Sequence, residues 1–127
     1  MNITYQFQFS AAHFYEQKKW SPQRNQEIFG ACYTPYGHGH NYTVEVSFPA
    51  TDELTRANAN YQTAQKIVNL LDHQHLNFVI EEFKDTVPTT ENIAHFLWQK
   101  MQTQCQLPPV RLRLFEMPTL WVELTHE

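Results

Sequence analysis

Residues 38–49 read HGHNYTVEVSFP and carry the clearest strand pattern in the chain. From Tyr42 onward, apolar side chains alternate with polar ones, which is typical of a β-strand with one buried face. Pro49 ends this strand because proline has no backbone N–H to donate to a β-ladder. Continued backwards, the positions that share the buried face reach His40 and His38, so both imidazoles extend the apolar face of the strand.

The same alternation occurs in residues 3–9, where the apolar positions continue through Ala11 to His13. Side chains two apart in a strand point to the same face, so two neighbouring strands with no bulge would bring His13, His38 and His40 together. Three neutral imidazoles suit zinc, which in catalytic sites commonly keeps a fourth position open. The alternative is that the H-x-H pair is only two polar residues at a strand start. A third histidine, His13, at a position that shares the buried face of its own strand favours the metal site.

The rest of the chain predicts two helices and two further strands. The first helix is expected at 61–71, after a polar loop at 52–60, and the second begins at Thr89 or Thr90 and ends before Pro108. The strands are expected at 110–114 and 120–124. The order ββααββ predicts an α+β fold, in which a four-stranded antiparallel sheet carries both helices on one face. Such a small sheet has open edges, so we expect copies of the chain to assemble into a larger sheet or barrel.

Length and composition narrow the class of protein. The 127 residues fit one domain, and we expect residues 1–127 to form it. Acidic residues outnumber basic ones by 13 to 9 with no long basic run, which argues against a nucleic-acid partner. Two cysteines cannot build a disulfide framework, the first residues do not resemble a signal peptide, and no apolar run is long enough to cross a membrane. We therefore expect a soluble, cytoplasmic protein.

Further residues suited to chemistry lie outside the histidine pattern. Cys32 lies in the long connection at 14–37. A divalent cation nearby could lower the pKa of its thiol and make it a base or nucleophile. The alternatives are a fourth zinc ligand and a small buried residue. Asp72 and His73 could form a carboxylate–imidazole pair for acid–base chemistry, or cap a helix, or lie in a surface loop. Glu116 could bind a guanidine-like ligand edge, or be a solvated strand end.

Five motifs follow one another along residues 3–124. They are Phe9-Ser10-Ala11-Ala12-His13, Cys32 followed by Gly37-His38-Gly39-His40-Asn41-Tyr42, Leu71-Asp72-His73, Thr89-Thr90-Glu91-Asn92, and the late Glu116. Together they resemble the 6-pyruvoyl-tetrahydropterin synthase family, which includes the 6-carboxytetrahydropterin synthases of queuosine biosynthesis. The resemblance implies the tunnelling fold and a zinc-dependent lyase that acts on 7,8-dihydroneopterin triphosphate. It also implies a homohexamer of two trimers with active sites between subunits.

The resemblance assigns a role to each candidate residue. These roles are zinc ligand for His13, His38 and His40, general acid/base for Cys32, proton relay from a neighbouring subunit for Asp72 and His73, pterin anchor for Glu116, and lining of the pterin pocket for Thr89, Thr90 and Glu91. Five residues separate Cys32 from His38, which is similar to the pyruvoyl-forming branch of tetrahydrobiopterin biosynthesis. The alternatives are the carboxy-forming branch and a non-catalytic oligomer that binds zinc and pterin.

Two features depart from the family pattern. The segment between residue 49 and Asp72 looks shorter than in typical members, which favours the non-catalytic alternative. No triphosphate clamp is evident in the sequence. Lys18, Lys19 and Arg24 are candidates by location only, and the alternative is that they are solvated loop charges.

Overall fold

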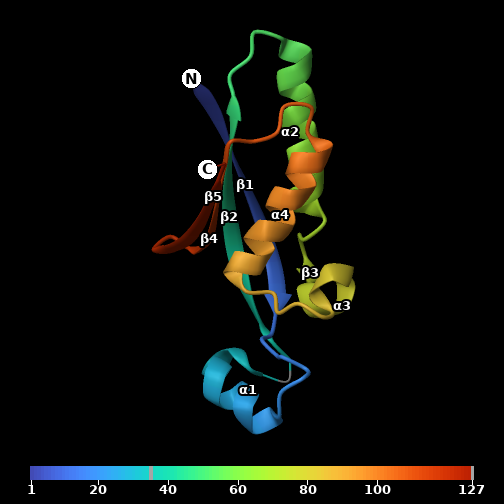
Figure 1. The fold of residues 1–127 in the computed structure, drawn as a ribbon, viewed down its shortest axis with the longest axis vertical. Helices are drawn as coiled ribbons and strands as arrows, with labels where there is room; N and C mark the ends of the chain where they lie inside the picture. The colour runs from blue at the N-terminus through green and yellow to red at the C-terminus, as the bar shows by residue number, and fades with distance from the viewer. Residues whose placement is uncertain (35, 127) are drawn as a thin grey trace.

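The computed structural model describes residues 1–34 and 36–126, which form one sheet with helices against one of its faces (Figure 1). The sheet has five strands in the order β3-β1-β2-β4-β5. The strands are β1 (Asn2–His13), β2 (His38–Pro49), β3 (Gln74–His75), β4 (Arg111–Met117) and β5 (Leu120–Thr125). The helices are α1 (Pro22–Phe29), α2 (Leu54–Asn69), α3 (Leu76–Val79) and α4 (Thr90–Gln104), with 3₁₀ turns at Gly30–Cys32 and Glu81–Phe83. Among the described residues, none of the helices is both long and apolar enough to span a membrane.

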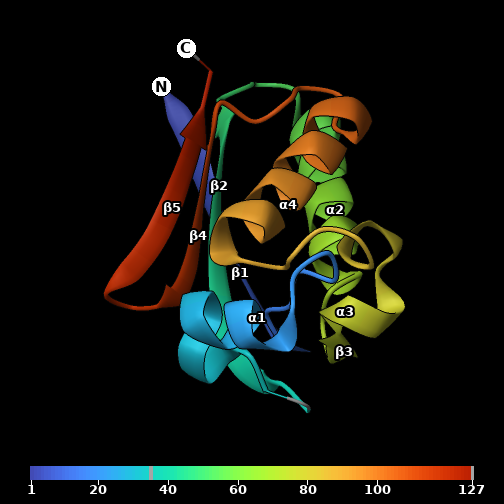
Figure 2. The ribbon, with the colours of Figure 1, turned by 60° about the horizontal axis from the view of Figure 1, so that its bottom comes forward.

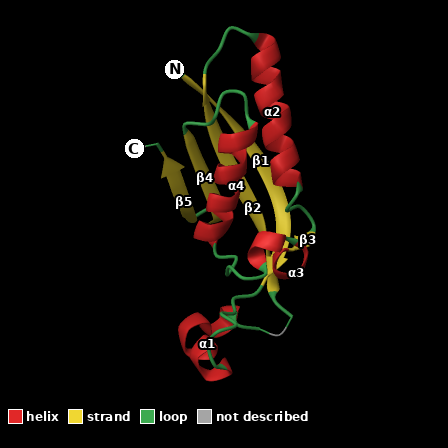
Figure 3. Ribbon diagram, turned by 45° about the vertical axis from the view of Figure 1, so that its right-hand side comes forward, coloured by secondary structure: helices red, strands yellow, loops and turns green. Residues whose placement is uncertain are grey.

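The predicted α+β fold is confirmed for the long strands and the long helices. The pairs β1·β2, β2·β4 and β4·β5 are all antiparallel, and α2 and α4 lie on the same face of the sheet (Figure 3). Apolar side chains buried between the two layers hold them together. The fully buried members of this core include Val44 and Val46 of β2, Ile93 and Leu97 of α4, and Leu114 of β4.

A short parallel strand, β3, makes the prediction of four purely antiparallel strands wrong. Its two residues pair beside β1, Gln74 with Ala11 and His75 with Ala12. A strand of this length cannot show an alternating pattern, so the sequence gives no signal for it. The pairing holds the end of α2 and the turn that follows it against the last part of β1.

Helix α2 runs from Leu54 to Asn69, so the predicted helix at 61–71 is confirmed for residues 61–69, and the predicted loop at 52–60 is wrong from residue 54 onward. The early turns of α2 carry few apolar residues, and one inward position is Asn60, which is only 2% exposed. Its Oδ1 accepts a hydrogen bond from the backbone N–H of Leu107 at 3.2 Å. A buried amide with a specific partner takes the place of an apolar residue and interrupts the apolar stripe that identifies a helix.

The connection between β1 and β2 is more regular than predicted, because it contains α1. Ser21 begins this helix by accepting a hydrogen bond from the N–H of Arg24 at 3.1 Å, and Pro22 occupies its start. Asn25 is buried, and its Oδ1 accepts a hydrogen bond from the N–H of Gln17 at 2.7 Å. Figure 2 shows α1 beyond the end of the sheet where β1 ends and β2 begins. The connection is therefore a folded unit beside the candidate site.

Helix α4 begins at the predicted threonines, with Thr89 as its N-cap: Oγ1 accepts a hydrogen bond from the N–H of Asn92 at 3.1 Å. We expect Thr89→Ala to lower the free energy of unfolding by about 1 kcal/mol, because that N–H loses its partner. Thr89→Asn should retain most of the stability, since asparagine also caps helices. Urea unfolding of the three proteins measures both changes.

Thr103→Ala is the matched control for this prediction. Thr103 is an exposed threonine in the same helix, and its hydroxyl donates only to carbonyls of its own helix, those of Gln99 and Lys100. We expect a change of less than about 0.5 kcal/mol in its free energy of unfolding. An equal loss of stability in Thr89→Ala and Thr103→Ala would contradict the capping role of Thr89.

Candidate active site

Three histidines meet at the end of the sheet where β1 ends and β2 begins. The pairing of β1 with β2 runs without a bulge from Asn2 opposite Pro49 to His13 opposite His38, and it places His40 opposite Ala11. The imidazole rings lie 4.8, 5.2 and 4.9 Å apart, centroid to centroid, and each offers a nitrogen within 4.8 Å of the others. The predicted convergence of the three imidazoles is therefore confirmed as geometry.

The ring nitrogens of His13 and His40 suit a metal ion. His13 has no exposed area, and its Nδ1 lies 3.0 Å from the carbonyl oxygen of Pro88. Since a carbonyl only accepts, Nδ1 carries the proton and Nε2 keeps its lone pair. Nε2 of His13 and Nε2 of His40 are buried without a hydrogen-bond partner. A divalent cation bound by three imidazoles would satisfy both atoms, so the donor set fits zinc.

The surroundings keep these imidazoles neutral, as metal ligation requires. Burial, followed by repulsion from His38 and His40, lowers the pKa of His13 to about 4. Burial also lowers the pKa of His40, and the carboxylate of Glu116 opposes that shift. At neutral pH the two rings offer lone pairs rather than protons.

Gly37 closes the loop onto this site. Its backbone has a φ of +78°, which side chains disfavour, and a Cβ there would lie 2.5 Å from the carbonyl oxygen of His13 and 3.1 Å from Nε2 of His75. Next to the same strand end, the amide of Asn77 both donates to the carbonyl of Phe14 and accepts from its N–H, each at 2.9 Å. These contacts fix the backbone that carries His13.

Glu116 lies beside the histidines rather than at a solvated strand end. Its side chain is 12% exposed, and Oε1 lies 2.9 Å from Nε2 of His40 without forming a hydrogen bond. The hydroxyl of Thr90 donates to Oε2 at 3.0 Å. Thr90 is buried, whereas Thr89 is half-buried and Glu91 is exposed in the first turn of α4. The carboxylate is thus held by α4 and faces the imidazoles.

Cys32 is half-buried at the end of the 3₁₀ turn that follows α1. Burial and the nearby charge of Glu116 raise the pKa of its thiol, which is opposite to the lowered pKa expected near a cation. The protein groups alone therefore favour the thiol over the thiolate. A cation at the histidines would act in the opposite direction.

Asp72 and His73 form a pair, and among the described residues no hydrogen bond or ion pair joins either of them to Cys32. Oδ2 of Asp72 lies 3.0 Å from Nδ1 of His73, and the positive φ of His73, 60°, makes the turn that lets the adjacent side chains meet. The N–H of Ser10 donates to Oδ1 at 2.9 Å, which is the first cause of a lowered pKa for Asp72. His73 lines a hollow together with His40 and Asn41, and Asp72 lines a second hollow with Ser10 and Asn41. The His73 ring is 82% exposed.

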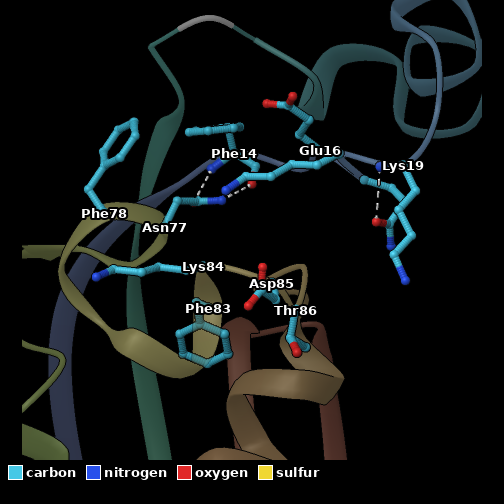
Figure 4. A pocket seen from close by; sticks show the side chains of 11 residues that line it. Phe14, Glu16, Lys19, Asn77, Phe78, Phe83, Lys84, Asp85 and Thr86 are labelled. Carbon is cyan, nitrogen blue, oxygen red and sulfur yellow. Dashed lines mark hydrogen bonds between the residues drawn. The ribbon is translucent and has the colours of Figure 1, made fainter.

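The basic residues suggested for triphosphate do not form a clamp around the histidines. Figure 4 shows the pocket that Lys18 and Lys19 line, with Asn77 and Phe14 on one side and Lys84 and Asp85 on the other. Lys84 is already paired with a carboxylate, that of Glu81, at 2.8 Å, and Arg24 lies over the ring of Trp20 at 4.5 Å. Lys18 and Lys19 therefore line a pocket that also contains a carboxylate, and Arg24 stacks on an aromatic ring instead of facing the histidines.

Sequence reasoning missed two tyrosines at the site. The hydroxyl of Tyr42 lies 3.3 Å from Nδ1 of His13, and the ring of Tyr15 packs against the ring of His13 with centroids 5.0 Å apart. Tyr42 belongs to the alternating positions of β2 that also place His40 and His38, so its position follows from that pattern. Tyr15 lies beyond the end of β1, where strand alternation no longer applies.

Comparisons with known proteins agree with this geometry. The family model for 6-pyruvoyl tetrahydropterin synthase matches residues 2–127. The human 6-pyruvoyl tetrahydrobiopterin synthase is 36% identical over 106 residues, which are 79% of this chain and 73% of the relative. The Drosophila melanogaster protein of the same name is 34% identical over 118 residues, 87% of this chain and 70% of the relative. The solved structure of Caenorhabditis elegans 6-pyruvoyl tetrahydropterin synthase superposes with a TM-score of 0.90 at 27% identity, covering 100% of this chain and 96% of that one.

The lowered pKa of His13 predicts a pH dependence of stability in chelator-treated protein. Between the ordinary pKa of 6.5 and the folded value of about 4, the unfolded chain binds a proton that the folded chain does not. Stability conferred by neutral His13 is therefore present above pH 6.5 and falls as the pH drops towards 4, by up to about 3 kcal/mol. Urea unfolding across this range measures the fall.

His13→Asn isolates the contribution of this one residue. Asparagine can still donate to the carbonyl of Pro88 but does not titrate in this range. We expect a shallower pH dependence in the variant, since the carboxylates titrate alike in both proteins. Identical slopes for the two proteins would show that His13 is not held neutral by the fold.

Proposed function

Because this chain belongs to the 6-pyruvoyl tetrahydropterin synthase family, we propose that it is a lyase that converts 7,8-dihydroneopterin triphosphate to 6-pyruvoyl-tetrahydropterin with release of triphosphate. The observation that carries the proposal is the set of His13, His38 and His40 with Glu116 beside it. Three imidazoles can hold a divalent cation, and an adjacent carboxylate can hold the guanidine-like edge of a pterin. The curated relatives named as tetrahydrobiopterin synthases support the pyruvoyl product over the carboxy product.

Zinc is the cofactor that these ligands suit, with His13, His38 and His40 as its protein ligands. When bound, zinc supplies Lewis acidity toward the hydroxyl oxygens of the substrate side chain and so acidifies the adjoining C–H. Three protein ligands would leave a further coordination position for substrate oxygen.

The protein residues bind the pterin and move the proton. Glu116 accepts the paired N–H groups of the pterin ring, one on each carboxylate oxygen, while Thr90 donates to Oε2 from a second direction. Thr89 and Glu91, at the start of α4, line the same pocket. Cys32, as a thiolate at Sγ, takes the proton from the substrate carbon, so the reaction needs a reducing compartment, for which we propose the cytoplasm.

We propose that Asp72 and His73 serve the site of a neighbouring subunit, within a hexamer of two trimers. The pair supports this because the His73 ring is 82% exposed, where a second chain can reach it. The Asp72 carboxylate orients the imidazole, which exchanges a proton as the counterpart of Cys32. Open sheet edges at β3 and β5 offer backbone groups for pairing between subunits.

Turnover of 7,8-dihydroneopterin triphosphate by the zinc-loaded protein tests the proposed reaction, with the pterin product identified by mass. We expect the pyruvoyl product together with free triphosphate. A carboxy product would assign the chain to the queuosine branch. Zinc and pterin binding without release of triphosphate would identify a binding protein instead of an enzyme.

Cys32→Ala tests the role of the thiol. We expect turnover to fall by about 10²- to 10⁴-fold with zinc content unchanged, because the substitution removes a general base but no metal ligand. Cys105→Ala is the matched control, since Cys105 is the other free cysteine and is buried in the core. Full turnover in zinc-loaded Cys32→Ala would remove the thiol from the mechanism.

Mixing two inactive variants tests whether the site is shared between chains. Suppose that Cys32 and His73 of one site come from different subunits. Random assembly of equal amounts of Cys32→Ala and His73→Ala chains then produces about a quarter of sites in which both residues are intact. We therefore expect co-refolded mixtures to recover about a quarter of the wild-type turnover. If each chain carries a complete site, the mixture stays as inactive as the separate variants.

A further inference from the structure

Residues 72–77, which begin with the Asp72–His73 pair, lie along the last part of β1, and we call them the docked segment. The peptide group of Ser10 binds the first two residues of this segment. Its N–H donates to Oδ1 of Asp72 at 2.9 Å, and its carbonyl accepts from the N–H of His73 at 2.6 Å. Strand β3, the middle of the docked segment, then pairs with residues 11–12 of β1.

The last residue of the docked segment, Asn77, binds β1 through its side chain. The pairing of β1 with β2 ends where His13 lies opposite His38, so Phe14 is the first residue beyond it. Oδ1 of Asn77 accepts from the N–H of Phe14 and Nδ2 donates to the Phe14 carbonyl, both at 2.9 Å (Figure 4). A side-chain amide thus takes the place of a neighbouring strand. Since an N–H only donates and a carbonyl only accepts, only this orientation of the amide makes both bonds.

The two edges of β1 are occupied by different elements, with β3 along one edge and β2 along the other. The N–H and C=O groups of successive residues in a strand point alternately to the two edges, so Ser10 and Phe14, four residues apart, face the same edge. Leu76, next to Asn77, is fully buried in the core, which holds this part of the docked segment against the sheet. The docked segment is therefore bonded to β1 both before and after His13 in the chain.

We propose that Asn77 is a positioning residue for the metal ligand His13, and that it couples the cation site to the Asp72–His73 pair. The carbonyl of Pro88 fixes the orientation of the His13 ring at Nδ1, at 3.0 Å, so the position of Nε2 depends on the backbone that carries the ring. Asn77 holds that backbone at the next residue. The role rests on the function proposed above, since it requires a divalent cation at the three histidines.

Asn77→Ala tests the role because it removes both bonds to Phe14. We expect the dissociation constant for zinc, measured by competition with a chromophoric chelator, to rise about tenfold, since contacts that orient metal ligands contribute about 10- to 100-fold to metal affinity. Asn77→Asp is a second variant of nearly the same shape. Its carboxylate can accept from the Phe14 N–H but has no proton for the carbonyl, so zinc affinity should fall there too.

Asn60→Ala is the matched control, since Asn60 also uses its side-chain amide to bind a backbone group. Its Oδ1 accepts from the N–H of Leu107 at 3.2 Å. Leu107 precedes β4, which begins opposite Ser47 at the end of β2 far from the histidines. We expect Asn60→Ala to lower the free energy of unfolding but to bind zinc like the wild type. An equal loss of zinc affinity in Asn60→Ala and Asn77→Ala would show a general effect of destabilisation and would overturn the role.

Amide hydrogen exchange tests the coupling in the wild type, without any substitution. Coupling is reciprocal, so if docking favours the cation, the cation favours docking by the same factor. We expect one equivalent of zinc to slow exchange at the N–H groups of Phe14 and His73 by up to about tenfold. The N–H of Val110, which donates to Ser47 at 2.8 Å far from the histidines, should change less and serves as the reference.

Two results of the exchange experiment would overturn the coupling. One is exchange at His73 that zinc slows no more than exchange at Val110 in the wild type. The other is an equal slowing at His73 in the wild type and in Asn77→Ala, because the effect would then bypass Asn77.

Zinc binding by the wild type separates failure of this role from failure of the proposed function. If the wild type binds no zinc, the role and the proposed function fall together. If it binds zinc and Asn77→Ala binds zinc with equal affinity, the role of Asn77 falls alone. If the wild type binds zinc but does not turn over 7,8-dihydroneopterin triphosphate, the proposed reaction falls, and the lowered zinc affinity of Asn77→Ala still supports the role.

Discussion

The unbroken antiparallel pairing of β1 with β2 is the constraint on which the site depends. It runs through every residue from Asn2 opposite Pro49 to His13 opposite His38. Because side chains alternate between faces, a slip of one residue would turn one strand's histidines to the helix-free side and its core residues to solvent. The same apolar burial that stabilises the sheet therefore fixes the parity of the imidazoles. The strand pairing by itself is enough to bring the three imidazoles together.

Gathering three imidazoles in a buried place opposes folding in the absence of a ligand. Burial and mutual repulsion disfavour the charged form of His13, and two ring nitrogens remain without partners. Contacts around the strand end offset this unfavourable free energy. The Asn77 amide makes two hydrogen bonds to the backbone of Phe14, and Gly37 packs against the His13 carbonyl. The N–H of Tyr15 donates to the Cys32 carbonyl. A bound cation would offset the desolvation of the ring nitrogens, so metal affinity and the free energy of unfolding are linked.

Alternation along the strands was enough to predict the sheet core and the convergence of the histidines, because a period of two carries both kinds of information. The cap at Thr89 was also predictable from local chemistry. Features that depend on single contacts were not predictable from the sequence. Strand β3 has only two residues, and the buried Asn60 interrupts the apolar pattern in the first half of α2. Adjacent Asp72 and His73 meet only through the positive φ of His73, which no pattern reveals. Residue type alone could not say which face of the sheet they occupy.

The proposed chemistry depends on a metal ion held by three imidazoles, and X-ray absorption at the zinc edge of the purified protein can detect those ligands. We expect three nitrogen ligands at about 2.0–2.1 Å and a fourth oxygen or nitrogen ligand, with no sulfur bound to the metal. Loss of these nitrogens in His38→Ala would locate the ion at the end of β1 and β2. A sulfur ligand at about 2.3 Å would make Cys32 part of the metal site and contradict its role as a free proton carrier.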